Sequence, residues 1–303
     1  MRTLYELPFF RDRWSYLYLE MGRLDVDADG LGFHQGDDVT PIPINQLGVI
    51  MLGPGTTITH AAIKALSRNN CLVAWTGQDA IRLYAASIGG TYSARRLLRQ
   101  AKLVSNDEKR LKVAWRMYQF RFKELIPPAV SLESIRGMEG IRVRKAYKIA
   151  ADKYGVEWKG RRYNQNDWKQ SDPVNRALSA ANACLYGICH AGILSAGYSA
   201  ALGFIHTGKM LSFVYDIADL YKTELTIPVS FKIAASNPPD LERQVRMECR
   251  KAFYDFKLME RLIPDIKEVL GVADDSGEGP DEFEGRIITL ASGTESGCIS
   301  WQS

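Results

Sequence analysis

Residues 177–205 contain no Asp, Glu, Lys or Arg, and no other feature constrains the fold of this chain more strongly. The stretch is rich in Ala, Gly and Ser and includes Asn182 and His190, so its summed hydrophobicity is weak for a membrane span. We therefore expect a helix that is buried on most of its sides by its neighbours. Its small side chains let other helices approach closely, which predicts a helical domain built around it.

The apolar pattern changes character near residue 88. Before that point, short β-prone runs are separated by Gly, Asp and Pro, and one helix is expected after Thr59 as its N-cap. From there to residue 270 the apolar spacing is helical. We predict an α+β protein with an N-terminal β domain (1–88), a larger all-α domain (89–270) and a flexible acidic tail (271–303).

The net charge of +4 conceals an asymmetry between the body and the tail. Residues 271–303 hold seven acids and one base, a balance of −6, so the preceding residues carry +10. A basic body suits a polyanionic partner, and a Gly-rich acidic tail suits a flexible segment. The five cysteines are odd in number and contain no CxxC pair, which argues against a disulfide framework or a zinc knuckle. Because no signal-peptide pattern opens the chain, we expect a cytoplasmic protein with no membrane contact.

One candidate for chemistry is Glu139, which lies between Gly137 and Gly140 near the expected start of a helix. The two glycines leave its carboxylate sterically open to a metal or a phosphate. An acid in the first turn of a helix, favoured there by the helix dipole, is the competing interpretation.

A second candidate lies in residues 203–222. Asp216 and Asp219 are three residues apart, so they are expected to project from one face of a helix, and His206 lies in the preceding loop. One His combined with carboxylates suits Mg²⁺ or Mn²⁺ at a phosphate site. A salt-bridged helix start explains the same residues about equally well, whereas His34, His60 and His190 are expected to be structural.

Residues 203–209 also fit the G-x4-G-K pattern of a phosphate-binding loop. Met210 stands where that motif requires Ser or Thr, and Phe204, Ile205 and His206 are bulky for a backbone cradle. We therefore do not expect an ATPase.

Basic and aromatic side chains are interleaved between Arg136 and Arg176, a stretch that contains eleven basic and five acidic residues. Lys and Arg side chains neutralise phosphates, and aromatic rings stack on unpaired nucleobases. This pattern therefore favours nucleic-acid binding. A solvated face with its aromatics turned inward is the alternative. A sparser basic set, Arg243, Arg246 and Arg250, has the spacing of one helical stripe.

The segments RGMEGIRVRKAY and GFIHTGKMLSFVYDIADL, together with MLGPGTTITHAAI, YGVEWKGRRYNQNDW and the CLYG helix, resemble the integrase subunit of CRISPR adaptation, in the branch associated with Cascade-type interference. The resemblance extends over the whole body of the chain. It implies an N-terminal β-sandwich-like domain, an all-α catalytic domain and a homodimer formed mainly through the former. It also implies double-stranded DNA and a small ferredoxin-like protein as partners.

The same resemblance implies roles for individual residues. Glu139, His206 and Asp219 would bind Mg²⁺ or Mn²⁺, with Asp216 as an auxiliary catalytic acid. The residues it places on DNA are Lys209, Arg243 and Arg246 at the site, Lys64 and Arg82 in the β domain, and Tyr163, Trp168, Tyr186 and Tyr215 around the catalytic centre. Met21 stands where close relatives carry a duplex-wedging tyrosine, and an arginine seen in some relatives is missing near Thr56 and Thr57.

The reaction that the resemblance implies is a transesterification. The 3′-hydroxyl of a protospacer strand would attack a phosphodiester at the edge of the CRISPR repeat, helped by the bound metal. Proton removal would fall to water or Asp216. A structure-selective endonuclease acting on branched DNA and a non-catalytic DNA-binding scaffold are the alternatives.

Overall fold

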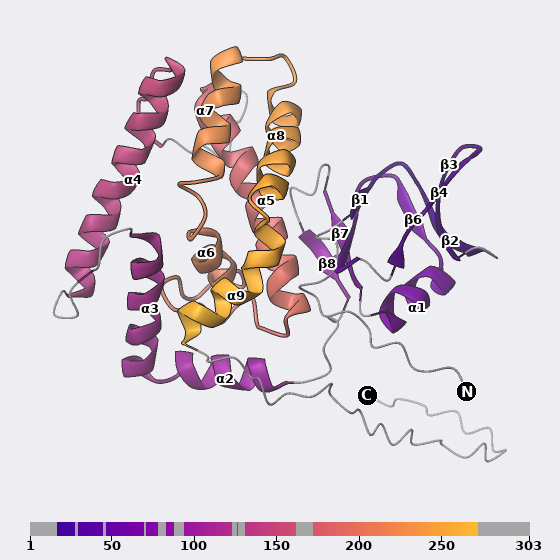
Figure 1. The fold of residues 1–303 in the computed structure, drawn as a ribbon, viewed down its shortest axis with the longest axis horizontal. Helices are drawn as coiled ribbons and strands as arrows, with labels where there is room; N and C mark the ends of the chain where they lie inside the picture. Colours follow the sequence, from indigo (N-terminus) through magenta and orange to yellow (C-terminus); the bar gives the residue numbers. More distant parts are fainter. Residues whose placement is uncertain are drawn as a thin grey trace, which may run out of the picture.

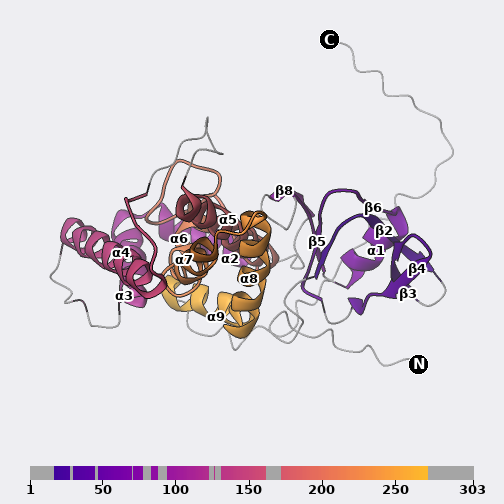
Figure 2. The same cartoon turned by 90° about the horizontal axis from the view of Figure 1, so that it is seen from above.

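The computed structural model of the chain describes residues 17–27, 30–44, 47–69, 71–77, 83–87, 94–122, 126, 131–161 and 172–271. Figure 1 shows a strand-rich part beside a larger helical part, which confirms the predicted α+β class. The view from above shows the same two parts side by side along the long axis of the molecule (Figure 2). The boundaries at residues 88 and 270 stay predictions, and the acidic tail beyond Gly271 lies outside the described residues.

The strand-rich part contains two four-stranded sheets. One sheet has the order β1-β5-β7-β8 and the other has the order β4-β3-β2-β6. The elements are β1 (Leu17–Leu19), β2 (Gly22–Asp27), β3 (Gly30–Gln35), β4 (Asp38–Pro41), β5 (Val49–Leu52), β6 (Thr56–Ile58), α1 (His60–Arg68), β7 (Leu72–Thr76) and β8 (Leu83–Ala86). The Thr59 hydroxyl caps α1 by accepting from the Ala62 amide at 3.2 Å, as predicted.

Strand β5 of the first sheet is buried on both faces. Because successive strand residues point to opposite sides, Val49 and Met51 of β5 pack into the helical core, whereas Ile50 and Leu52 pack against β2, β3 and α1. All four are buried, which is why this run reads as continuously apolar. Strand β7 does the same with Leu72 and Ala74 on one face and Val73 on the other, so both strands join the β part to the helical part.

Helix α5 (Pro173–Ser195) lies at the centre of the helical part (Figure 1). Pro173 opens it at a position where no backbone N–H is needed, and the Asp172 side chain caps it by accepting from the Asn175 amide at 3.0 Å. Among the described residues it is the one helix long and apolar enough to cross a membrane, but two thirds of its apolar window, 67%, is buried within the protein. The prediction of a buried core helix is confirmed for residues 177–195, but the helix ends at Ser195 and residues 196–205 are not helical.

The other helices surround α5. They are α2 (Arg95–Val104), α3 (Asp107–Arg121), α4 (Leu132–Tyr154), α6 (Ser212–Ala218), α7 (Thr226–Ser236), α8 (Leu241–Asp255) and α9 (Leu258–Leu270). The α5 glycines permit close packing: a Cβ on Gly192 would lie 2.0 Å from Cδ2 of Leu262 in α9. The carboxyl end of α3, the second and third turns of α4 and the end of α6 meet to form the candidate site.

Candidate active site

Asp216 organises the loop that carries His206. Its side chain is fully buried, and its carboxylate accepts the backbone amides of Phe204 at 2.6 Å, Ile205 at 3.1 Å and His206 at 2.9 Å. Three inward-pointing amides cannot also cradle a phosphate, so the structure agrees with the exclusion of a phosphate-binding loop. The loop shape is therefore fixed by one buried carboxylate.

The same carboxylate orients the imidazole of His206. Nδ1 of His206 lies 2.7 Å from Oδ1 of Asp216, which leaves Nε2 as the ring atom for a ligand. The imidazole also meets the ring of Tyr215 edge-on, with centroids 5.8 Å apart. A carboxylate behind an imidazole is the arrangement that fixes a metal-binding histidine in other proteins.

Arg121, the last residue of α3, joins Glu139 to Asp219. Its Nη1 lies 3.5 Å from Oε1 of Glu139 on α4, and its Nη2 lies 3.8 Å from Oδ2 of Asp219 at the end of α6. Nη2 also donates to the backbone oxygen of Asp216 at 3.3 Å. The Arg121 side chain is 3% exposed, so a buried guanidinium links the segments that hold Glu139, Asp216 and Asp219.

Two further cations contact the carboxylates. Nη1 of Arg142 lies 3.4 Å from Oε2 of Glu139, and Nζ of Lys222 lies 2.5 Å from Oδ1 of Asp219. Lys222 also donates to the Tyr186 hydroxyl at 2.7 Å. Burial raises the pKa of Asp219, but the Lys222 ammonium and the Arg121 guanidinium outweigh burial and hold that pKa below its ordinary value. Asp219 is therefore a carboxylate at neutral pH.

Two sequence predictions about these acids are corrected. Asp216 and Asp219 do not share one environment: α6 ends at Ala218, Asp216 faces the 204–206 loop, and Asp219 faces Arg121 and Lys222. Glu139 does not lie in the first turn of its helix, where Glu133 is found instead. Its contacts, rather than the helix dipole, account for its position.

The donor atoms suit a hard divalent cation. Glu139 and Asp219 supply carboxylate oxygens, and His206 supplies a ring nitrogen set by Asp216. In the described part of the chain, no three His, Cys, Asp or Glu side chains are arranged to hold a metal ion. The Arg121 guanidinium lies between the two carboxylates instead, so a cation already stands there.

Aromatic side chains predicted at the site lie beside it. The rings of Tyr186 and Tyr215 meet edge-on, with their centroids 5.1 Å apart. Tyr186 contacts Lys222, and Tyr215 contacts His206. Trp158, from the basic and aromatic stretch, stacks on Tyr147 at 4.7 Å and packs in the helical core, which is the inward-facing alternative. Tyr163, Trp168 and Arg82 lie outside the described residues.

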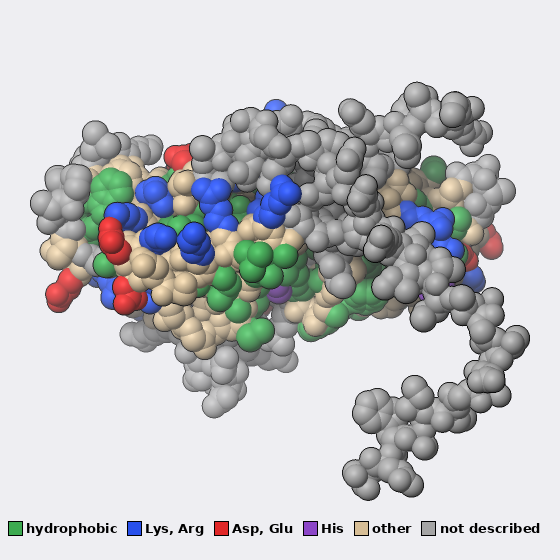
Figure 3. All heavy atoms as spheres, turned by 90° about the horizontal axis from the view of Figure 1, so that it is seen from below, with side chains coloured by type: hydrophobic (Ala, Val, Ile, Leu, Met, Phe, Trp, Pro, Cys, Tyr) green, Lys and Arg blue, Asp and Glu red, His purple; other side chains and the backbone are tan. Residues whose placement is uncertain are grey.

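The remaining predicted DNA contacts lie on the surface. Lys209 is exposed in the loop before α6, Lys64 is exposed on α1, and Arg243 is exposed on α8, where Arg246 is half-buried. Figure 3 shows Lys and Arg side chains gathered on the lower face of the helical part, the side on which α2 lies in Figure 1. Exposed bases on that helix are Arg95, Arg99 and Lys102.

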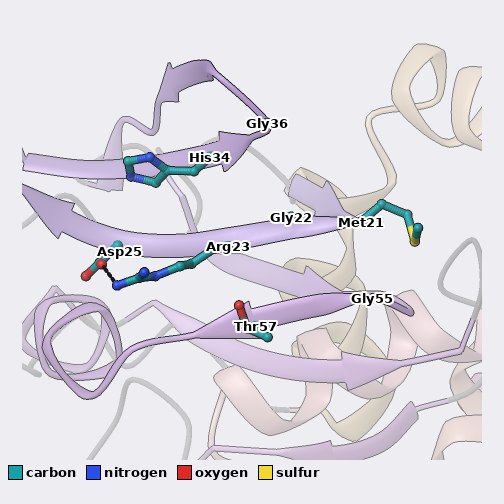
Figure 4. Close-up of a pocket in the computed structure, with 8 residues that line it drawn as sticks. All are labelled: Met21, Gly22, Arg23, Asp25, His34, Gly36, Gly55 and Thr57. Carbon is teal, nitrogen blue, oxygen red and sulfur yellow. Dashed lines mark hydrogen bonds and ion pairs between the residues drawn. The ribbon is translucent and has the colours of Figure 1, made fainter.

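The second sheet carries a hollow of about 680 Å³ on its surface. Figure 4 shows its lining, in which Arg23 pairs with Asp25 on β2 and His34 lies on the neighbouring strand β3. Met21 stands at its end, 69% exposed and with a backbone φ of 55°. The residue that replaces the expected tyrosine is thus presented to solvent.

The sequence interpretation missed Arg121, Arg142 and Lys222. Arg142 and Lys222 lie three residues beyond Glu139 and Asp219, a spacing that brings side chains together on a helix, so this signal was available. Arg121 has no such signal, because its contacts depend on how α3 packs against α4 and α6.

Comparisons with known proteins show which family the chain is similar to. The family model described as CRISPR associated protein Cas1 matches residues 15–125 and 118–237. A CRISPR-associated endonuclease Cas1 of Geobacter sulfurreducens is 50% identical over 86% of this chain and 85% of that protein. A Cas1 endonuclease of Thermus thermophilus is 48% identical over 88% of this chain and 82% of that protein. The crystal structure of a TtCas1–DNA complex aligns with a TM-score of 0.74 and 46% identity, covering 87% of this chain and 99% of that one.

Proposed function

The chain belongs to the Cas1 family of CRISPR-associated proteins, and from this premise we propose that it is a metal-dependent DNA integrase of CRISPR adaptation. One observation carries the proposal: Glu139 on α4 and Asp219 at the end of α6 contact the same buried Arg121, and Asp216 orients the imidazole of His206. Acids that only stabilise a helix do not require a buried guanidinium shared between two carboxylates.

Glu139, His206 and Asp219 would hold Mg²⁺ or Mn²⁺. The bound ion would act as a Lewis acid on the scissile phosphate and neutralise the charge that develops there. Asp216 would position His206; its oxygens already accept four donors, so water is a better proton acceptor than this carboxylate. Lys209, Arg243 and Arg246 would neutralise neighbouring phosphates.

In the proposed reaction, the DNA supplies the nucleophile. The 3′-oxygen of the incoming strand forms a bond to phosphorus as the bond to the leaving 3′-oxygen breaks, and the proton lost by the first hydroxyl is gained by the second. Double-stranded DNA, a second copy of the chain and a small ferredoxin-like protein are the proposed partners, in the cytoplasm. Lys64, Arg82, Tyr163, Trp168, Tyr186 and Tyr215 are proposed DNA contacts.

A structure-selective endonuclease is the second candidate, because the Geobacter and Thermus relatives are named endonucleases. A non-catalytic DNA-binding scaffold is the third, because the two acids do contact three cations. Strand joining with the ferredoxin-like partner separates them. DNA ending in a 3′-hydroxyl should be joined in Mg²⁺ or Mn²⁺, and DNA ending in a 3′-phosphate should not. Equal processing of both ends indicates the endonuclease, and a DNA-binding function that is independent of metal indicates the scaffold.

A further inference from the structure

The two helices that carry Glu139 and Asp219 pack on different neighbours. Helix α4 packs against α3 and α7, whereas α6 packs against α5. The side chain of Arg121, at the end of α3, bridges the two acids: Nη1 lies 3.5 Å from Oε1 of Glu139, and Nη2 lies 3.8 Å from Oδ2 of Asp219. The separation of the two carboxylates is therefore linked to the position of one guanidinium.

Arg121 is held in place by groups other than these two acids. Its Nη2 donates a hydrogen bond to the backbone oxygen of Asp216 at 3.3 Å, and its guanidinium lies over the ring of Tyr118, 5.3 Å from the centroid. The side chain is 3% exposed, so neighbouring atoms leave it little freedom to move. The guanidinium is thus a fixed point against which the two carboxylates can be set.

The contacts of Arg121 with the two acids are long. Both distances exceed the value of about 2.7–2.9 Å that is typical of a charged N–H···O hydrogen bond. Each carboxylate oxygen has a further lone pair, so the oxygens that face Arg121 can also bind an ion. Partners that lie behind metal-binding side chains and orient them have this relation to the metal in other proteins. Arg121 therefore need not leave the centre when an ion enters.

Net charge does not decide how well this centre holds an ion. Three carboxylates and three cations meet there: Glu139, Asp216 and Asp219 with Arg121, Arg142 and Lys222. Because neither sign is in excess, the affinity for a divalent ion depends on how closely the ligand oxygens and nitrogen match the geometry that the ion requires.

We propose that Arg121 is the positioning residue of the metal centre. The two ends of its guanidinium set Glu139 and Asp219 for one divalent ion before the ion or the DNA arrives. The planar fork is required, because the single ammonium of a lysine cannot reproduce a bridge between two carboxylates on different helices. The inference rests on the proposed function and adds that the protein, rather than the metal, brings the two acids together.

Substitution of Arg121 tests the bridge, with Mn²⁺ binding measured by electron paramagnetic resonance in the absence of DNA. Arg121→Lys keeps the charge and removes the fork, so Mn²⁺ should bind at least about tenfold more weakly than to wild type. Arg121→Met removes both and should bind at least as weakly. Wild-type Mn²⁺ affinity in folded Arg121→Lys, or tighter binding in folded Arg121→Met, would overturn the inference.

Arg116 provides a matched control on the same helix. Its Nε and Nη2 donate to the backbone oxygens of Val269 and Leu270 at 2.9 and 3.0 Å, away from the acids of the centre. Arg116→Lys should therefore lower the urea midpoint while leaving the affinity for Mn²⁺ unchanged. An equal loss of Mn²⁺ affinity in Arg116→Lys would reduce the Arg121 effect to general destabilisation and would also overturn the inference.

A measurement on the wild-type protein decides if no Arg121 variant folds. In a spectrum of ¹⁵N-labelled arginine side chains, the signal that moves in both Glu139→Gln and Asp219→Asn belongs to Arg121. Mg²⁺ should shift that signal in wild type and leave the Arg116 signal in place; an Arg121 signal that ignores Mg²⁺ contradicts the inference. Absence of Mn²⁺ binding to wild type under every condition, DNA included, would refute the proposed function itself.

Discussion

Nδ1 of His206 lies 2.7 Å from Oδ1 of Asp216, and the same carboxylate accepts three consecutive backbone amides. The imidazole and its loop are therefore positioned by a single buried side chain. In residues 203–209, which match a phosphate-binding pattern, the amides of residues 204–206 turn inward toward protein instead of outward toward a ligand.

The first prediction concerns Asp216→Asn. The Asn side chain has one oxygen, and its NH₂ group would point at backbone N–H donors that the carboxylate accepts in wild type. Some of these buried backbone N–H groups would therefore lose their hydrogen-bond acceptor. We expect about 3 kcal/mol less stability toward urea and little strand joining. His206→Gln, which keeps the backbone amides on Asp216, should cost less than about 1 kcal/mol. Wild-type stability of Asp216→Asn would show that the amide cluster contributes little.

The second prediction concerns Glu139→Gln. The variant keeps the shape of the side chain and removes its charge, so strand joining should fall by at least about 100-fold. DNA affinity in the absence of metal should change less than about threefold, because the surface Lys and Arg side chains proposed to contact phosphates are intact. Joining rates measured under single-turnover conditions and binding measured by fluorescence anisotropy check the two parts. Joining at the wild-type rate would remove Glu139 from the centre.

The third prediction compares two helical glycines. A Cβ on Gly192 meets Leu262 at 2.0 Å, whereas a Cβ on Gly137 meets nothing within 4 Å. Gly192→Ala should destabilise the protein by about 1–2 kcal/mol because buried Leu262 must move. Gly137→Ala should stabilise it by about 0.5–1 kcal/mol because alanine favours the helix. Chemical denaturation of both variants tests the opposite signs, and a shared sign would contradict the packing described.

The fourth prediction concerns pH. Burial lowers the pKa of His190 below its ordinary value of 6.5, so the unfolded chain binds a proton more readily than the folded protein does. The stability that neutral His190 contributes is present above the unfolded value and is lost as pH falls below it. Between pH 7.5 and 5.5, wild type should lose more unfolding free energy than His190→Gln. Equal losses in urea titrations at the two pH values would disprove this contribution.

Local periodicity explains which parts of the fold the sequence predicts. The Thr59 cap and the buried helix over residues 177–195 depend on side chains adjacent in the chain or one helical turn apart, and both are confirmed. The end of α6 was not predicted, because the four residues Asp216 to Asp219 read as continuous helix. In the structure α6 ends at Ala218, and the two aspartates contact different partners.

The candidate site is less accessible from sequence. The family resemblance supplied Glu139, His206 and Asp219. From the residues alone, Glu139 was also explained as an acid favoured by the helix dipole, and residues 203–222 left metal binding and a salt-bridged helix start open. Arg121 lies in a basic and aromatic helix where nothing marks it as buried. Its burial follows from three helices converging, which is a property of tertiary packing rather than of local pattern.

The central claim is that Glu139, His206 and Asp219 hold one divalent ion. Crystals of the protein with a branched DNA, grown in Mn²⁺, test it by anomalous scattering at the manganese edge. The account predicts a single strong peak about 2.1–2.3 Å from a carboxylate oxygen of Glu139, Nε2 of His206 and a carboxylate oxygen of Asp219. A peak elsewhere, or none in crystals where the DNA is bound, would contradict it.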